Sequence, residues 1–513
     1  MPTRARARRA VAALDSVAAR LYGWRWNPLH QPGTVAVASL LVLLASGLYL
    51  ILFYRVGDPA GSVARLAADP WLGSWIRSLH RYASDLFILA ALFHAFRLWS
   101  QDRSWGPRAL AWVSGSVLLG IGLVCAWTGF VMAWDTFGYR LALQGGHLFD
   151  ALPIFSEPLS RIFAGDQPVP SAFYFVNLFL HIAMPLGMGV LIWIHVSRVA
   201  RPTFLPPRRV TWSIVVALVL TSIALPAGFE GAADPLVLPY STAINIPSAW
   251  WLPITERLSP AGAWLFLVTT FGLLIAVPFL SRRRKSASVV DPRLCTGCNQ
   301  CPQDCPWHAI TMVERDDDRP SLVALVDPDL CVSCGICAGS CAPMGVGPPG
   351  RTGRDQLAAL RDRALDDRPR GIVLVCCNEA PAAHRDALVA LGASLHPVGC
   401  VGNLHSSVVE LLLRGGADGV LIAGCPPRDC LGREGPKWLH ERLYNDREAE
   451  LQPRVDRRRV RTTTIAPGAF VESRAAYDQF RAELDALSSE LGAASTDELP
   501  EVECEPVPLE EAR

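Results

Sequence analysis

The chain has 513 residues, of which 51% are hydrophobic, and its formal net charge is +1. The length indicates several domains, and the balanced charge gives no reason to expect nucleic acid as a partner. Of the 15 cysteines, 14 follow residue 290. Their clustering in CxxCxxC patterns favours metal ligation in a reducing compartment over a disulfide scaffold.

The N-terminal segment, residues 1–33, is rich in arginine. Its basic composition is also that of a transit peptide, but no cleavage site precedes a short apolar region. We therefore expect a cytoplasmic amphipathic helix that lies on the membrane surface.

Almost all long apolar runs fall in the first 280 residues, where six segments are long enough to cross a bilayer. These are residues 34–54, 78–99, 109–133, 171–200, 211–228 and 261–280. If each segment crosses once, all arginine-rich stretches fall on one side of the membrane: the N-terminus, residues 97–108, residues 198–209 and residues 281–285. By the positive-inside rule, this side is cytoplasmic. The sequence thus predicts an α-helical transmembrane bundle of about six helices.

Two histidine pairs with equal spacing lie inside these apolar segments: His80 with His94, and His181 with His195. A spacing of 14 residues corresponds to about 21 Å along a helix and returns to within about 40° of the same face. Ionisable side chains inside a membrane helix are costly, so two equal pairs indicate a shared role. Two such helices can clamp two flat cofactors one above the other, which predicts bis-histidine ligation of two haems.

Three arginines lie one helical turn beyond these histidines. Arg77 precedes the first histidine of its pair by three residues, and Arg97 and Arg198 each follow the second histidine of theirs by three. A haem propionate would need a charge-assisted partner at that position. Snorkelling of the side chains to the membrane interface is the alternative, and both roles can hold at once.

Glycines repeat the same interval, because Gly33 and Gly47 are 14 residues apart, as are Gly115 and Gly129. Glycine inside a helix is otherwise only destabilising. A flat macrocycle between helices requires side-chain-free patches at its own level, so the glycines support the di-haem prediction.

Residues 20–200 resemble the four-helix haem core of cytochrome b from respiratory and photosynthetic quinol-oxidising complexes. The matching pieces are the paired glycines, R-x-x-H-x13-H-x-x-R at 77–97, W-x-x-G at 112–115, T-G-F at 128–130 and H-x3-P-x9-H at 181–195. The resemblance implies a four-helix di-haem core at 34–205, followed at 206–285 by two further transmembrane helices with an outer loop.

The same resemblance implies which residues hold each haem. The outer haem would be held by His80 and His181, with Arg77, Gly47 and Gly129 beside it. The haem on the cytoplasmic side would be held by His94 and His195, with Arg97, Arg198, Gly33 and Gly115 beside it.

The outer loop departs from the family pattern. Residues 247–250 stand where the family has P-E-W-Y, and the glutamate that serves quinol oxidation there is absent. Ala133 also replaces the proline of a P-W pair. We therefore expect the outer quinol site to be altered. Glu256 is expected to be a solvated loop residue, and Cys125 a buried packing thiol.

Eight cysteines after the last apolar segment follow the bacterial two-cluster ferredoxin signature, in which three cysteines of one motif and one of the other hold each cubane. One [4Fe–4S] cluster is expected on Cys295, Cys298, Cys301 and Cys341, and the other on Cys331, Cys334, Cys337 and Cys305. Structural zinc would not need eight cysteines in this order. The ferredoxin-like α+β domain is expected at 286–350.

A small α/β domain is expected at 365–490, followed by an acidic tail at 491–513. The runs 371–377 and 419–425 are of buried-strand type, and residues 404–419 form an amphipathic helix that ends at glycines. Cysteines cluster at the strand ends. The absence of G-x-G-x-x-G and of a phosphate loop leaves a nucleotide site unsupported.

The pattern CCN…GC-x-G-N…GADGVLIAGCPPRDC resembles the delta-type iron–sulfur subunit of methyl-viologen-reducing hydrogenases. The resemblance implies a [2Fe–2S] cluster and docking on a flavin-containing heterodisulfide reductase subunit. Ala380 replaces one family cysteine. Four ligands remain: Cys377 (or Cys376), Cys400, Cys425 and Cys430. The alternative is a degenerate domain that serves only docking.

Together these features predict a multi-pass protein of the bacterial cytoplasmic membrane, with its iron–sulfur domains in the cytoplasm. It would carry two haems b, two [4Fe–4S] clusters and one [2Fe–2S] cluster, and act as the quinone-reactive subunit of an oxidoreductase. Its cytoplasmic partner would be a flavoprotein or heterodisulfide-reductase-like, hydrogenase or dehydrogenase subunit. A redox sensor or docking scaffold without quinone turnover is the alternative. The sequence is compatible with either direction of electron flow and with a homodimer.

Overall fold

The computed structural model describes residues 2–154, 157–163, 168–197, 203–234, 236–237, 242–280, 286–317, 319–362, 371–378, 380–445 and 447–497. The chain forms two compact units. The first comprises Met1–Ser288, Cys305–Thr311 and Leu325–Ser333. The second comprises Val289–Asp304, Met312–Ala324 and Cys334–Arg513.

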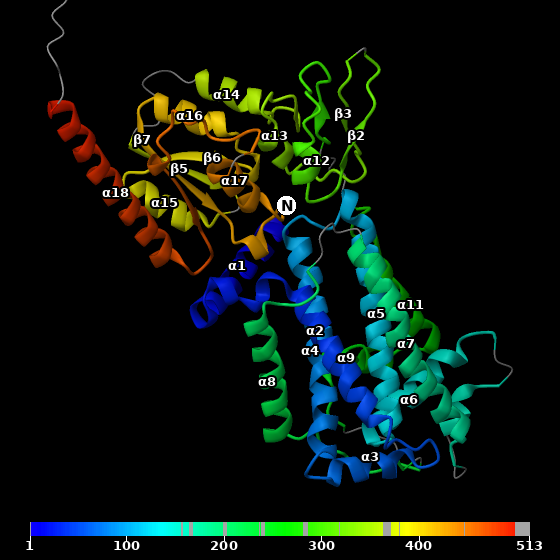
Figure 1. Cartoon of the computed structure of the whole chain (residues 1–513). Helices are drawn as coiled ribbons and strands as arrows, with labels where there is room; N and C mark the ends of the chain where they lie inside the picture. The colour runs from blue at the N-terminus through cyan, green and yellow to red at the C-terminus, as the bar shows by residue number, and fades with distance from the viewer. Residues whose placement is uncertain are drawn as a thin grey trace, which may run out of the picture. The chain divides into compact units, whose positions relative to one another are not determined.

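Four long helices form the centre of the first unit (Figure 1): α2 (Pro32–Leu50), α4 (Gly73–Ser100), α5 (Ala109–Ala133) and α7 (Ser171–Ser197). Among the described residues, these are the helices with the length and apolar composition of a membrane span. Helix α2 packs against α4, and α5 packs against α7. The α-helical class and the four-helix core expected from the sequence are confirmed.

The last two expected spans are shorter than the sequence suggested. Helices α8 (Arg208–Ala224) and α11 (Pro260–Ala276) have 17 residues each. Proline limits both, because Pro226 follows α8 closely and Pro278 follows α11, and neither residue can continue a helical hydrogen-bond ladder. Within the described ranges, the structure therefore supports four candidate spans rather than six.

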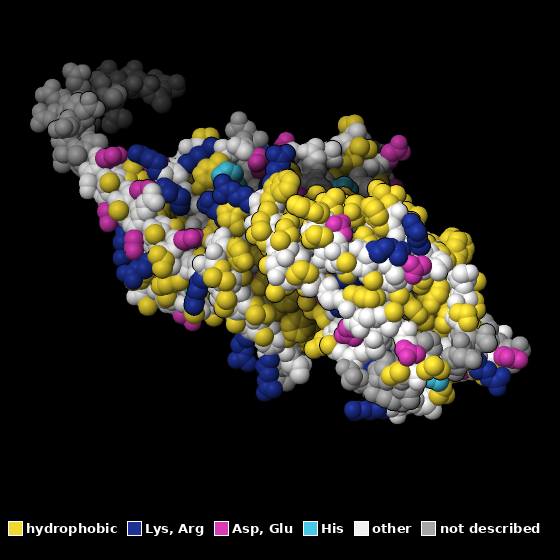
Figure 2. Space-filling model, turned by 90° about the horizontal axis from the view of Figure 1, so that it is seen from below, with side chains coloured by type: hydrophobic (Ala, Val, Ile, Leu, Met, Phe, Trp, Pro, Cys, Tyr) yellow, Lys and Arg dark blue, Asp and Glu magenta, His cyan; other side chains and the backbone are white. Residues whose placement is uncertain are grey.

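The long helices expose apolar side chains to their surroundings. Along α7 the residues Phe175, Phe179, Leu186, Val190 and Trp193 are all exposed. Hydrophobic side chains cover broad areas of the visible surface of the helical unit (Figure 2). Exposed apolar area on this scale marks contact with lipid or protein, and together with the four spans it makes this a multi-pass membrane protein.

Further helices complete the unit. They are α1 (Pro2–Tyr22), η1 (Trp24–Trp26), η2 (Pro28–His30), α3 (Pro59–Ala68), η3 (Gly106–Arg108), α6 (Thr136–Asp150), η4 (Leu159–Phe163), α9 (Ile246–Ala249) and α10 (Leu252–Thr255). The helix expected in the N-terminal segment is present as α1. It packs against α4.

The second unit contains a four-stranded parallel sheet in the order β6-β5-β7-β8. Its strands are β5 (Gly371–Cys377), β6 (Ser394–Val398), β7 (Ala417–Gly424) and β8 (Val460–Thr464). One face is covered by α16 (Ser406–Arg414) and α17 (Gly435–Tyr444), and the other by α15 (Ala382–Ala390) and α18 (Phe470–Asp497). This is the expected small α/β fold.

The ferredoxin segment is built from short elements. These are β1 (Val289–Val290), α12 (Gln300–Asp304), β2 (Ile310–Val313), β3 (Val323–Val326), α13 (Ile336–Ser340), β4 (Val346–Gly347) and α14 (Gly353–Arg361). Strand β1 pairs with β4 in antiparallel fashion, and β2 neighbours β3. Three single turns, η6 (Val401–Asn403), η7 (Pro427–Asp429) and η8 (Arg457–Arg459), lie in the α/β part.

Candidate redox sites

The four histidines of the helical unit form two facing pairs between α4 and α7. The ring centroids of His80 and His181 are 6.2 Å apart, and those of His94 and His195 are 6.4 Å apart. A metal–imidazole bond is about 2 Å long, so two imidazoles on one metal ion have centroids about 6.3 Å apart. Both pairs therefore have the spacing that one haem iron between them requires.

Each of the four spaced glycines lies against one of these histidines. A Cβ atom added to Gly33 would lie 2.9 Å from Cε1 of His94, and one added to Gly47 would lie 3.2 Å from Cε1 of His80. The same holds for Gly115 against His195 and for Gly129 against His181, at 2.9 Å each. The glycines thus form two levels, one with each histidine pair, where a side chain would displace the imidazole.

Hydroxyl-bearing residues that precede the glycines orient the rings. Ser46 Oγ lies 2.9 Å from Nδ1 of His80, and Ser114 Oγ lies 3.0 Å from Nδ1 of His195. At His181, Nδ1 lies 2.9 Å from the carbonyl oxygen of Cys125 and 3.1 Å from Thr128 Oγ1. A ligand histidine whose Nδ1–H is donated in this way presents Nε2 to the metal.

Sequence reasoning missed these orienting residues. The signal was available in the doublets Ser-Gly at 46–47 and 114–115 and Thr-Gly at 128–129. Cys125, expected to be a buried packing thiol, lies beside His181: its carbonyl oxygen is 2.9 Å and its sulfur 3.6 Å from Nδ1 of that histidine.

Substituting Gly115 by valine is expected to abolish haem binding at the His94–His195 level, because the added side chain would enter the space of His195. Gly189 on α7 provides the matched control, since a Cβ there meets nothing within 4 Å. The measurement is the haem-to-protein ratio from the pyridine haemochrome spectrum. Equal haem loss in Gly189→Val would mean that the effect comes from helix destabilisation and not from a clash with the imidazole of His195.

The arginines expected beside the haem propionates have protein partners. Arg77 donates to the carbonyl oxygens of Ala227 and Gly228, at 2.6 and 3.0 Å. Arg97 is almost fully buried and makes two contacts of 3.0 Å with the carboxylate of Asp15. Arg198 lies outside the described residues. A propionate role for these arginines therefore stays a prediction, and Arg97 has a structural role in addition.

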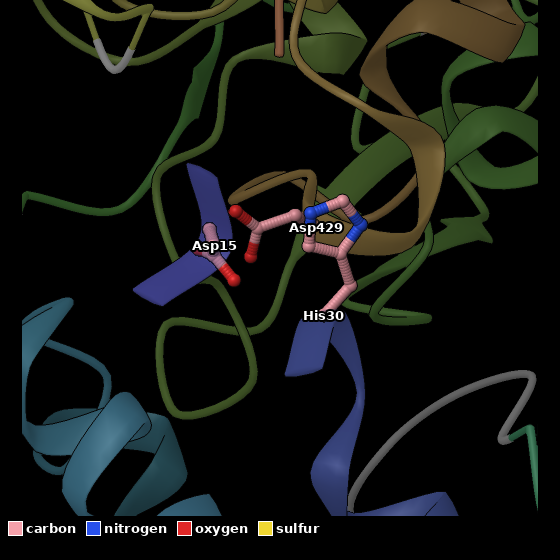
Figure 3. Close-up of side chains that lie close together, drawn as sticks. All are labelled: Asp15, His30 and Asp429. Atoms are coloured by element: carbon pink, nitrogen blue, oxygen red, sulfur yellow. The ribbon is translucent and has the colours of Figure 1, made fainter. Parts of the chain in front are cut away.

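Asp15 belongs to α1 and lies near His30 of η2, as Figure 3 shows. Asn27, between them in the chain, donates to Asp15 at 3.3 Å. Figure 3 also draws Asp429, which belongs to the second unit. The carboxylate of Asp15 pairs with the guanidinium of Arg97 on α4, so this ion pair anchors the N-terminal helix α1.

Substituting Asp15 by alanine is expected to destabilise the docking of α1 by about 3–5 kcal/mol, the usual cost of removing one partner from a buried ion pair. Limited trypsin digestion should then cleave the arginine-rich α1 much faster. The control is Asp58→Ala, which breaks the exposed pair with Arg65 and should leave α1 protected. Unchanged protection of α1 in Asp15→Ala would contradict the anchor.

The outer loop carries a polar group in place of the absent glutamate. Ser248 Oγ lies 3.4 Å from a carboxylate oxygen of Asp85 on α4, and Asn245 donates to the same carboxylate at 3.0 Å. Glu256 forms a two-pronged ion pair with Arg140, with both contacts at 2.7 Å. Glu256 is exposed, as expected of a loop residue, and its ion pair with Arg140 also ties the loop to α6.

The cysteines assigned to the first [4Fe–4S] cluster lie around one pocket of the second unit. They are Cys295, Cys298, Cys301 and Cys341, with Val290, Met312 and Val346 among the apolar residues that line the same pocket. Gly297 and Asn299 have φ of 80° and 62°, so the backbone between the cysteines turns through the left-handed region. The amide of Gly345 donates to Cys341 Sγ at 3.2 Å. These residues fit a cubane cluster.

The cysteines assigned to the second [4Fe–4S] cluster are divided between the units. Cys305 and Cys331 belong to the first, where their Sγ atoms accept from the amides of Ala309 and Ser288, each at 3.4 Å. Cys334 and Cys337 belong to the second. This ligand set therefore rests on the sequence pattern.

Four cysteines of the α/β part form a closed group. Cys377 at the end of β5 contacts Cys400 and Cys425, and Cys430 contacts the same two thiols. Hydrogen bonds from Cys400 and Cys425 hold the pKa of Cys377 and Cys430 below the usual thiol value, which favours the thiolate form that binds iron. A Cβ on Gly435 would lie 2.7 Å from Cys400 Sγ, so glycine keeps this position open. The group fits a [2Fe–2S] cluster.

Cys376 lies on the opposite face of β5. Its side chain belongs to the apolar cluster with Leu388 and Tyr477, whereas Cys377 belongs to the cluster that contains Cys425 and Cys430. Burial raises the pKa of Cys376 to about 11, so it remains a neutral thiol. The two-residue periodicity of a strand thus separates the two adjacent cysteines that the sequence left as alternatives.

Comparison with known families assigns three parts of the chain. Residues 25–203 match the cytochrome b/b6/petB family, residues 294–345 match the 4Fe–4S dicluster domain, and residues 372–488 match the delta subunit of methyl-viologen-reducing hydrogenase. A solved structure titled "Hyperthermophilic respiratory Complex III" is similar over 49% of this chain and 75% of that chain, with 19% sequence identity and a TM-score of 0.40.

The fold and the family matches define a membrane electron-transfer protein. It is a cytochrome b domain, a 4Fe–4S dicluster domain and a hydrogenase delta-subunit domain fused in one chain. It carries haem b and [4Fe–4S] clusters and transfers electrons through them. Haem iron and iron–sulfur clusters each supply one-electron chemistry, while the protein sets their ligands, spacing and surroundings.

Proposed function

We propose that this protein links the quinone pool, through two b haems and its iron–sulfur clusters, to a redox partner in the cytoplasm. The observation that carries the proposal is the pair of histidine levels, each with the spacing of one haem iron, in a chain that continues into cluster-binding domains. We assign His80 and His181 to the outer haem. We assign His94 and His195 to the haem on the cytoplasmic side.

Within each unit, neighbouring residues support a continuous path. In the first unit, Arg108, just before α5, lies over the ring of Trp307 at 4.5 Å, two residues after the cluster ligand Cys305. In the second unit, a Cβ on Gly432 would lie 3.3 Å from Cys400 Sγ and 3.6 Å from Cys334 Cβ. A single glycine therefore separates a ligand of the proposed [2Fe–2S] cluster from a ligand of the second [4Fe–4S] cluster.

The partner follows from the delta-subunit match. We propose that the partner is a flavoprotein or heterodisulfide-reductase-like subunit, a hydrogenase or a dehydrogenase. It would exchange electrons with the [2Fe–2S] cluster held by Cys377, Cys400, Cys425 and Cys430. We propose that the protein lies in a bacterial cytoplasmic membrane with its arginine-rich loops and iron–sulfur domains in the cytoplasm, as the positive-inside rule favours. Quinone would then react beside the cytoplasmic-side haem, since the outer loop lacks the family's glutamate.

The test uses the purified, detergent-solubilised chain with its haems reduced under anaerobic conditions. After a menaquinone or ubiquinone analogue is mixed in, the haems are expected to become oxidised, and their absorption spectrum should change to that of the oxidised form. Haem that remains reduced with either analogue would refute the quinone link and favour a redox sensor or docking scaffold.

A further inference from the structure

A buried arginine lies between the ferredoxin cysteines and the cysteine group of the α/β part. Arg442 on α17 is only 1% exposed. It donates to Ser340 Oγ of α13 at 3.1 Å and to the carbonyl oxygen of Gly402 in η6 at 2.8 Å. One guanidinium thus connects the helix that contains Cys337 to the turn that follows Cys400.

The contact between α13 and η6 leaves room for the Arg442 guanidinium only because glycine lies beside it. A Cβ on Gly339 would lie 2.5 Å from Nη2 of Arg442 and 2.7 Å from the carbonyl oxygen of Gly402, so the close approach of the two elements requires glycine. Asn403 adds a second link, donating to the carbonyl oxygen of Gly335 at 3.0 Å. The two cysteine-bearing parts are therefore held at a fixed separation.

The charge of Arg442 is only partly neutralised. The ionisable groups that face it include Asp304, Arg447, His405 and the cysteine side chains at 400 and 337. The carboxylate of Asp304 also binds Arg447 and accepts from Ser340 at 2.6 Å. Nε of Arg442 is buried and has no hydrogen-bond partner among the described residues.

We propose that Arg442 is a positioning residue for electron transfer between the ferredoxin clusters and the [2Fe–2S] cluster, and that its positive charge raises the reduction potential of the clusters beside it. The inference rests on the proposed [2Fe–2S] site. One electron leaves one cluster as the other accepts it, with no bond or proton exchanged. A fixed cation stabilises the reduced, more negative cluster, and it acts strongly here because the site excludes water.

The experiment is a redox titration of the full, cluster-loaded chain, followed by electron paramagnetic resonance. Arg442→Met is expected to lower the ratio of reduced to oxidised cluster at a fixed potential by about tenfold, which is 59 mV for one electron. Arg442→Lys keeps the charge and should change that ratio much less. Asp304→Asn removes the opposing charge and should shift the potential in the opposite direction. Arg454→Met, which removes an arginine that pairs with Glu410 in the same domain, is the control.

A purely structural role for Arg442 predicts a different pattern. Methionine and lysine would then act alike, or Asp304→Asn would shift the potential in the same direction as Arg442→Met, and either result overturns the inference. If Arg442→Met does not fold, the direction of the potential shift can still be measured in Arg442→Lys and Asp304→Asn. Cluster signals that are present but do not shift in any variant refute this inference alone. Absence of a [2Fe–2S] signal from the unsubstituted chain refutes the proposed site as well.

Discussion

Replacing His94 by leucine is expected to remove one of the two b haems and to leave the other in place. The two histidine levels have separate ligands and separate glycine contacts, so the His80–His181 level keeps its full set. The remaining imidazole, His195, cannot alone supply the two axial bonds of a six-coordinate haem. The haem-to-protein ratio should fall from about two to about one, and a redox titration of the α band should show one component.

The control for this substitution is His147→Leu. His147 lies at the end of α6 with a half-exposed side chain and is far in sequence from either histidine pair. It should leave both haems bound. Loss of both haems in His94→Leu, with the protein still folded, would mean that the two levels are not independent sites.

Replacing Cys377 by serine is expected to abolish the [2Fe–2S] signal, whereas replacing the adjacent Cys376 by serine should leave it intact. Cys377 belongs to the closed group of four thiols, and Cys376 packs on the other side of the sheet. Serine is nearly isosteric with cysteine, so the pair compares two similar changes at neighbouring positions. Iron content should fall by about two atoms per chain only for the first variant.

The ferredoxin clusters provide an internal reference in both variants, because their [4Fe–4S] signals should persist. A [2Fe–2S] signal that survives Cys377→Ser but disappears in Cys376→Ser would reverse the assignment. Persistence of the signal in both variants would place the cluster on other residues.

The grouping of the four histidines into two levels could be predicted from the sequence because helical periodicity is regular. A spacing of 14 residues fixes both the rise and the face of a helix, so the periodicity alone groups His80 with His94 and pairs the glycines in the same way. The residues that orient the rings, such as Ser114, could not be assigned by periodicity, because their role depends on packing between two helices.

Contacts between residues far apart in the chain, and the orientation of strands, could not be predicted from the sequence for similar physical reasons. The partner of Arg97 is Asp15, which lies 82 residues earlier in the chain, and no local pattern indicates such a pair. The choice between Cys376 and Cys377 required the orientation of β5, since both cysteines end the same buried strand. The length of α8 and α11 was overestimated because apolar residues continue past the prolines that end these helices.

The central claim is that the haems and the iron–sulfur clusters form one path for electrons within a single chain. The most direct test is rapid photoreduction of the oxidised, cluster-loaded protein by a low-potential dye that is too bulky to enter the helical bundle. The account predicts that cluster reduction is followed by reduction of a b haem, at a rate independent of protein concentration. A haem that stays oxidised while the clusters are reduced, or a rate that rises in proportion to protein concentration, would contradict it.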